Sequence, residues 1–144
     1  MKPAVFLRIA AVLTLIHAIL HTIGGVFGKP TPGPAEQAAA VMKANHFLLM
    51  GNLRTYWDFY MGFSLGITIF LTMEAIVFWL LASLAANAGI RLRPILSVFA
   101  LGYLVFAINS MRFFFLAPVI TEVLIALCLM LAVITAKALP GEAI

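Results

Sequence analysis

The chain has 144 residues, of which 65% are hydrophobic and 10% are charged. Soluble globular domains are about half apolar and a quarter charged, so this composition excludes a water-soluble domain and favours a helical integral membrane protein. The net charge of +4 is scattered along the chain, which fits charges at span ends and gives no reason to expect a nucleic-acid partner. A single cysteine excludes an intrachain disulfide, a CxxC redox pair and a four-thiolate metal site within this chain.

Four apolar runs are each long enough to cross a bilayer, which takes about 20 helical residues. The first run lacks the short apolar core and small-residue cleavage site of a signal peptide, so we expect it to be a retained span. Trp57 and Trp79 bracket the second run and lie about 33 Å apart in a helix, which matches one bilayer core with an aromatic anchor at each interface. The predicted spans are residues 4–27, 57–80, 94–115 and 118–139.

The segment between the first two spans is predicted to lie on the membrane surface. Residues 35–50 follow a Pro/Gly-rich link and show an apolar stripe opposite polar residues, with Glu36 in the first turn. Such a helix lies flat in the interface, and Gly51 and Asn52 would end it. The predicted fold class is therefore all-α: a four-helix transmembrane bundle with a short interfacial amphipathic helix, forming a single integral membrane domain over residues 1–144.

Positively charged residues predict the orientation of the spans. With four spans, the N-terminus, the loop that carries Arg91 and Arg93, and the C-terminal end share one side of the membrane. This side has slightly more Lys and Arg than the other, and cytoplasmic loops carry an excess of these residues. We therefore expect a multi-pass protein with both termini in the cytoplasm.

Polar side chains within apolar spans are costly, so their placement indicates where function lies. His17 and His21 are four residues apart and share one face of the first span. In the predicted topology, polar residues of the other spans gather in the same outer half of the membrane. The predicted ligand-binding residues are His17, His21, Asp58, Asn109, Arg112 and Glu122. Glu74 lies nearer the cytoplasmic end and turns away from Asp58, so it requires a partner on another span.

Each of these features also has a structural interpretation. The two histidines equally fit interhelical hydrogen bonds that fix packing. For Arg112, an ion pair with Glu122 or Asp58 is favoured because an unpaired charge in the bilayer would be very costly. Two histidines four residues apart cannot be opposite axial ligands of one haem, and alone they are a weak zinc signal. No metal site is predicted, and the cofactor is left open.

Three short sequences resemble a known group of proteins. They are HTIGG at residues 21–25, YWDFYMGF at 56–63 and RFFFLAP at 112–118. Together they resemble small bacterial four-span membrane proteins that are loosely similar to the DoxX group. This resemblance implies a location in the bacterial cytoplasmic (inner) membrane and an association with quinone-linked sulfur oxidation. No catalytic residue of that group can be matched to a position in this chain.

Three classes of function stay open. The first is a protein that binds a quinone, isoprenoid or lipid, with Arg112 holding a carbonyl or phosphate group and a histidine orienting the ligand. The second is a membrane enzyme that uses a histidine and a carboxylate for acid–base chemistry such as isomerisation. The third is a structural accessory subunit of a larger membrane complex. The expected partners are the lipid bilayer, a quinone or lipid ligand, and a membrane-protein partner or second copy of the chain.

Overall fold

The computed structural model describes residues 2–137, apart from the side chains of residues 86–88. Within this part of the chain, four helices are long and apolar enough to cross a membrane, as predicted. They cover Pro3–Val26, Tyr56–Ala85, Gly89–Phe113 and Leu116–Thr135. The last span begins two residues earlier and ends earlier than predicted, and residues 138–139 of the prediction lie outside the described residues.

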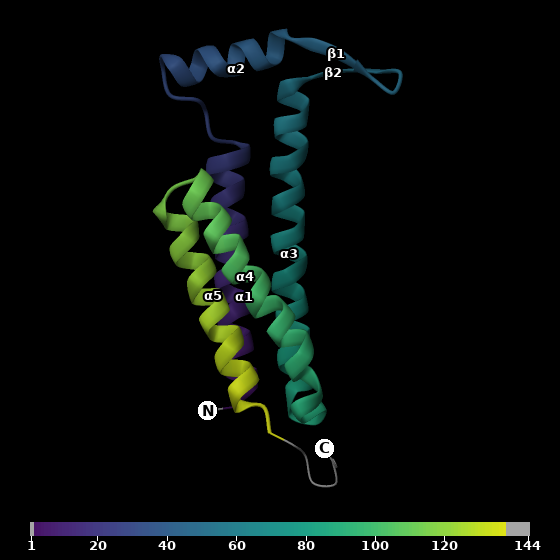
Figure 1. The fold of residues 1–144 in the computed structure, drawn as a ribbon, viewed down its shortest axis with the longest axis vertical. Helices are drawn as coiled ribbons and strands as arrows, with labels where there is room; N and C mark the ends of the chain where they lie inside the picture. The colour runs from purple at the N-terminus through teal and green to yellow at the C-terminus, as the bar shows by residue number, and fades with distance from the viewer. Residues whose placement is uncertain (1, 138–144) are drawn as a thin grey trace. The chain divides into compact units, whose positions relative to one another are not determined.

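The elements follow one another as α1 (Pro3–His21), the π-helix η1 (Thr22–Val26), α2 (Pro34–Ala44), β1 (His46–Leu49), β2 (Asn52–Thr55), α3 (Tyr56–Ala88), the 3₁₀-helix η2 (Gly89–Leu92), α4 (Arg93–Phe113) and α5 (Leu116–Thr135) (Figure 1). The chain divides into two compact units. Unit 1 comprises Met1–His17 and Leu71–Ile144, and unit 2 comprises Ala18–Phe70. The boundaries therefore fall inside α1 and α3.

Unit 1 contains the hydrophobic core, to which α1, α3, α4 and α5 all contribute. The α4 and α5 helices lie side by side (Figure 1). At the centre, the Phe78 ring meets the Phe99 ring edge-on, with 5.1 Å between ring centroids, and also contacts Tyr103. Many core residues are alanines, whose small side chains let helices approach closely, as in membrane-protein packing. The fully or nearly buried core residues are Leu7, Ala10, Ala11, Phe78, Ala82, Ala85, Leu92, Leu96, Ala100, Tyr103, Ile125, Ala126, Leu129 and Ala132.

In unit 2, the first span ends in a wider turn than an α-helix makes. The backbone N–H of Phe27 donates to the Thr22 carbonyl at 3.0 Å, a bond that spans five residues and defines the π-helix η1. The Thr22 hydroxyl also donates to the Ala18 carbonyl at 2.6 Å. After the Pro/Gly-rich link, Gly33 has φ of 100° and Pro34 begins α2, where its missing N–H costs no helical bond.

The predicted helix over residues 35–50 is wrong beyond residue 44. Asn45 leaves the helical conformation (φ −87°, ψ 109°), and both its backbone N–H and its side-chain amide donate to the Val41 carbonyl, which ends α2. Residues 46–55 form an antiparallel hairpin in which Leu49 pairs with Asn52. The loop residues Met50 (φ 47°) and Gly51 (φ 82°) both have positive φ, as a two-residue hairpin turn of type I′ requires. Gly51, which was predicted to end the helix, therefore forms the hairpin turn together with Met50.

Candidate functional site

A buried carboxylate of α5 lies at the centre of the candidate site in unit 1. Glu122 is 0% exposed, and its Oε1 atom accepts a hydrogen bond of 2.8 Å from the Ser110 hydroxyl on α4. His17 on α1 places Nε2 4.0 Å from the same oxygen. Among the described residues, the second oxygen, Oε2, has no hydrogen-bond partner. A buried polar atom without a partner is costly, so this oxygen marks a place where a further donor would be stabilising.

The His17 ring is held between the carboxylate and an aromatic side chain. It is 8% exposed and stacks on the Phe106 ring of α4, with ring centroids 6.3 Å apart. An imidazole can donate and accept a proton near neutral pH, and a carboxylate beside it can share that proton. The pair therefore joins α1 to α5 through chemistry that is suited to proton exchange.

A second carboxylate of unit 1 is paired with a tyrosine. The Tyr103 hydroxyl on α4 donates to Glu74 Oε2 on α3 at 2.6 Å, and the Thr14 hydroxyl lies 3.4 Å from the same tyrosine oxygen. Thr14 also donates to the Ala10 carbonyl of its own helix at 2.9 Å. The prediction that Glu74 requires a partner on another span is confirmed.

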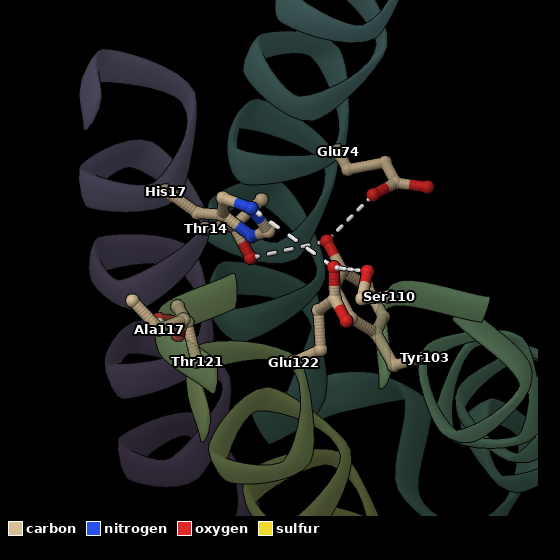
Figure 2. Close-up of polar contacts among 8 residues, drawn as sticks. All are labelled: Thr14, His17, Glu74, Tyr103, Ser110, Ala117, Thr121 and Glu122. Atoms are coloured by element: carbon tan, nitrogen blue, oxygen red, sulfur yellow. Dashed lines mark hydrogen bonds and ion pairs between the residues drawn. The ribbon is translucent and has the colours of Figure 1, made fainter. Parts of the chain in front are cut away.

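Together these side chains form what we call the polar cluster of unit 1, to which α1, α3, α4 and α5 each contribute. Figure 2 shows them pointing toward one another between the helices. Its members are Thr14, His17, Glu74, Tyr103, Ser110 and Glu122. Thr121, also drawn in Figure 2, instead donates to the Ala117 carbonyl of its own helix at 3.1 Å and takes no part in the cluster contacts.

Two other predicted site residues have structural contacts within unit 2. His21 Nε2 lies 3.0 Å from the Ser64 carbonyl oxygen of α3, which matches the interhelical packing interpretation. The Asp58 carboxylate accepts the Thr55 backbone N–H at 2.7 Å, while the Thr55 hydroxyl accepts the Asp58 N–H at 3.1 Å. This reciprocal arrangement is a capping box that satisfies amide groups at the start of α3.

The remaining two predicted residues lie on exposed positions of α4. Asn109 is exposed, and the Arg112 guanidinium lies 5.7 Å from the Phe113 ring centroid in the last helical turn, where a cation is favoured by the helix dipole. In the part of the chain that the structure describes, Arg112 and Glu122 form no ion pair. Ser110, and not Arg112, contacts Glu122, which was one of the two partners predicted for Arg112, the other being Asp58.

The sequence interpretation missed three hydroxyl-bearing members of the polar cluster: Thr14, Tyr103 and Ser110. Their signal was present, because a hydroxyl within an apolar span needs a partner. It was weak, because serine and threonine hydroxyls often bond to their own helix, as Thr121 does. Among the described residues, no group of three or more His, Cys, Asp or Glu side chains is arranged to hold a metal ion.

Four long apolar helices whose outer surfaces carry large apolar side chains are typical of a helical membrane protein. In comparisons with protein-family models, curated proteins and solved structures, none matches this chain. The resemblance to DoxX-like proteins therefore stays a prediction.

Proposed function

We propose that this chain is a small helical membrane protein that binds a lipophilic molecule with a polar head, such as a quinone, isoprenoid or lipid, at the polar cluster of unit 1. The observation that carries the proposal is the fully buried Glu122, whose Oε2 has no partner among the described residues. A hydroxyl of the ligand, as in a quinol (the reduced form of a quinone), an isoprenoid alcohol or a lipid headgroup, would supply the donor that this oxygen lacks. Sites for such ligands combine a few polar groups with apolar surroundings, as Glu122 and His17 do here.

A membrane enzyme is the second candidate. It is supported by the 4.0 Å separation between His17 Nε2 and Glu122 Oε1, which is close enough for the two groups to act on one substrate proton. Double-bond isomerisation is the simplest reaction of this type, because it needs a proton removed at one carbon and returned at another. On this proposal His17 would move the proton and Glu122 would stabilise the charged imidazole.

The same proposal includes the setting of the protein. We place the four spans as a transmembrane bundle in a bacterial inner membrane, with both termini in the cytoplasm. The support is the excess of positive charge predicted for that side, including Arg91 and Arg93.

The polar contacts of the cluster would equally support a structural subunit of a larger complex. The following experiment distinguishes this function from ligand binding and from catalysis.

The test is native mass spectrometry of the protein released from mild detergent, with an absorption spectrum of the same sample. We expect a stoichiometric small molecule in the wild type and its loss in Glu122→Gln, which keeps the side-chain size but replaces one carboxyl oxygen with an amide NH₂ that cannot accept a hydrogen bond. Thr121→Ala is the matched control on α5, because its hydroxyl bonds only to its own helix in the contacts described above. A wild-type protein without a bound molecule, or a ligand retained by Glu122→Gln, would contradict the proposal.

Chemical change in the captured molecule distinguishes the enzyme from the binding protein. If incubation with the wild type converts that molecule to an isomer of the same mass, and His17→Ala binds it without conversion, the acid–base function is supported. An unchanged molecule supports binding alone. Co-purification of a second protein, with no small molecule on either chain, favours the structural subunit.

A further inference from the structure

A groove on the surface of unit 2 follows the first two turns of α3. It has a volume of about 330 Å³ and is lined by Arg54, Asp58, Phe59, Gly62 and Phe63. The four α3 residues have the spacing of one helix face. Gly62 forms an open floor, since a Cβ atom at that position would meet nothing within 4 Å. The groove is therefore polar at its hairpin end and apolar along the helix.

The hairpin positions the arginine of this groove. In the strand register Phe47 lies opposite Arg54, so the two side chains share one face of the hairpin. The Phe47 ring packs against Tyr56 and Phe59, with ring centroids 4.9 Å and 5.4 Å apart. These contacts hold that face of the hairpin against the start of α3. Arg54 is thereby kept at the polar end of the groove.

Two cations against the one Asp58 carboxylate leave a net positive charge at this end, which favours an anion. The Asp58 carboxylate is occupied in the capping box with Thr55, where it accepts a backbone N–H. Arg54 uses one N–H of its guanidinium to donate to the Leu53 carbonyl at 2.9 Å, and a guanidinium has five such donors. The Lys43 ammonium adds a second positive charge at the same end of α3, 4.4 Å from the Trp57 ring centroid.

We propose that this groove binds an anionic phospholipid. Arg54 donates to the lipid phosphate, and an acyl chain lies over Gly62 along the Phe59 and Phe63 rings, which pack together with ring centroids 6.2 Å apart. A guanidinium fork matches a phosphate group, and Trp57 and Tyr60, whose rings contact each other, are the aromatic types found at membrane interfaces. Phe63 is 71% exposed, which suits contact with an acyl chain. This site lies wholly within unit 2 and does not depend on the function proposed for unit 1.

The headgroup contact is tested by titrating the purified protein with phosphatidylglycerol or phosphatidylcholine and measuring the bound lipid by native mass spectrometry. We expect one phosphatidylglycerol to bind preferentially, and Arg54→Gln to weaken it about fivefold, the effect of roughly one cation near an anionic lipid. Phosphatidylcholine binding is expected to change less, because the choline cation offsets the charge of the same phosphate group. Lys29→Gln, an exposed cation of the same unit, is the control. Undiminished phosphatidylglycerol binding in Arg54→Gln, or an equal loss in Lys29→Gln, would overturn the proposal.

The acyl-chain contact is tested by filling the groove. Gly62→Leu is expected to weaken the binding of both lipids, whereas Gly102→Leu, at a glycine of α4 that is also exposed and open, is expected to leave their binding unchanged. Circular dichroism verifies that both variants are folded. If they are not, the lipid titration of Arg54→Gln tests the proposal. Competition with inorganic phosphate distinguishes a site for a lipid headgroup from a site for free phosphate. If it displaces phosphatidylglycerol at equal concentration, the site takes free phosphate and the lipid proposal is wrong.

Discussion

In unit 1 the carboxylates of Glu74 and Glu122 accept hydrogen bonds from side chains of α4, whereas in unit 2 His21 and Tyr60 contact main-chain carbonyl oxygens. The first arrangement brings titratable groups together in the low-dielectric interior. The second fixes the path of the backbone, although a Thr22–Thr68 hydroxyl contact of 3.0 Å adds one side-chain pair. Polar residues within apolar helices therefore serve different purposes, and the partner of each side chain shows which purpose it serves.

The largest expected effect tests whether the apolar core of unit 1 is the main source of stability. Leu129→Ala removes a side chain that is 0% exposed in this core and should lower the free energy of unfolding by about 2–5 kcal/mol. Leu131→Ala on the same helix should cost less than about 1 kcal/mol, because this side chain is 42% exposed and lipid is as apolar as leucine. Unfolding in mixed detergent micelles measures both values, and equal losses would contradict the comparison.

A pair of tyrosine variants compares the two kinds of hydrogen bond directly. Tyr103→Phe removes the donor to Glu74 and should cost about 1–3 kcal/mol, since a partly buried carboxylate loses its partner. Tyr60→Phe removes a 3.0 Å bond to the Gly25 carbonyl at a more exposed position and should cost under about 1 kcal/mol. The same unfolding measurement applies. A larger loss for Tyr60→Phe would mean that the backbone contacts of unit 2 matter more than the polar cluster.

The hairpin tip offers a test confined to unit 2. Gly51→Ala places a Cβ atom at φ of 82° and should strain the turn by about 1–2 kcal/mol. Amide hydrogen exchange of residues 46–55 should accelerate while the core helices of unit 1 keep their protection. Gly62→Ala is the control, because its added Cβ atom has open space in a helix. Faster exchange throughout unit 1 would show that the hairpin is coupled to the core.

The smallest expected effect concerns the start of α3. Thr55→Ala removes the hydroxyl that accepts the Asp58 N–H and should cost about 1 kcal/mol, as the loss of a helix cap does. Hydrogen exchange should accelerate in the first turn of α3. Thr135→Ala, whose hydroxyl bonds to Leu131 at the end of α5, should leave that turn unchanged. No change in Thr55→Ala would remove the support for a backbone-organising role of Asp58.

The spans were predictable because hydropathy accumulates over about 20 residues, so errors at single positions average out. The hairpin was not. The run from Phe47 to Leu49 is short and apolar, which fits a helix or a strand, and the loop Met50–Gly51 lacks the Asn-Gly or Asp-Gly pair that is typical of a hairpin. The helix end at Asn45 depends on a side-chain bond that only the folded chain displays.

The candidate site was predictable only in part. A partner for Glu74 on another span was predicted. Periodicity does not show which helices are neighbours, so Tyr103 could not be identified as that partner from the sequence. An ion pair of Arg112 with Glu122 or Asp58 was predicted from charge alone. Residues two positions apart in an α-helix are separated by about 200° around the helix axis. Because Ser110 faces Glu122, the side chain of Arg112 points to a different side of α4.

Met50 has a chemical consequence that follows from its place at the hairpin tip. Its side chain is 95% exposed, so a dissolved oxidant reaches the thioether directly where the hairpin tip faces water. Oxidation adds one oxygen atom and converts an apolar side chain into a polar sulfoxide. In sealed vesicles, a membrane-impermeant oxidant would therefore label Met50 from one side alone, and the mass of the peptide that contains it would reveal which compartment the hairpin faces.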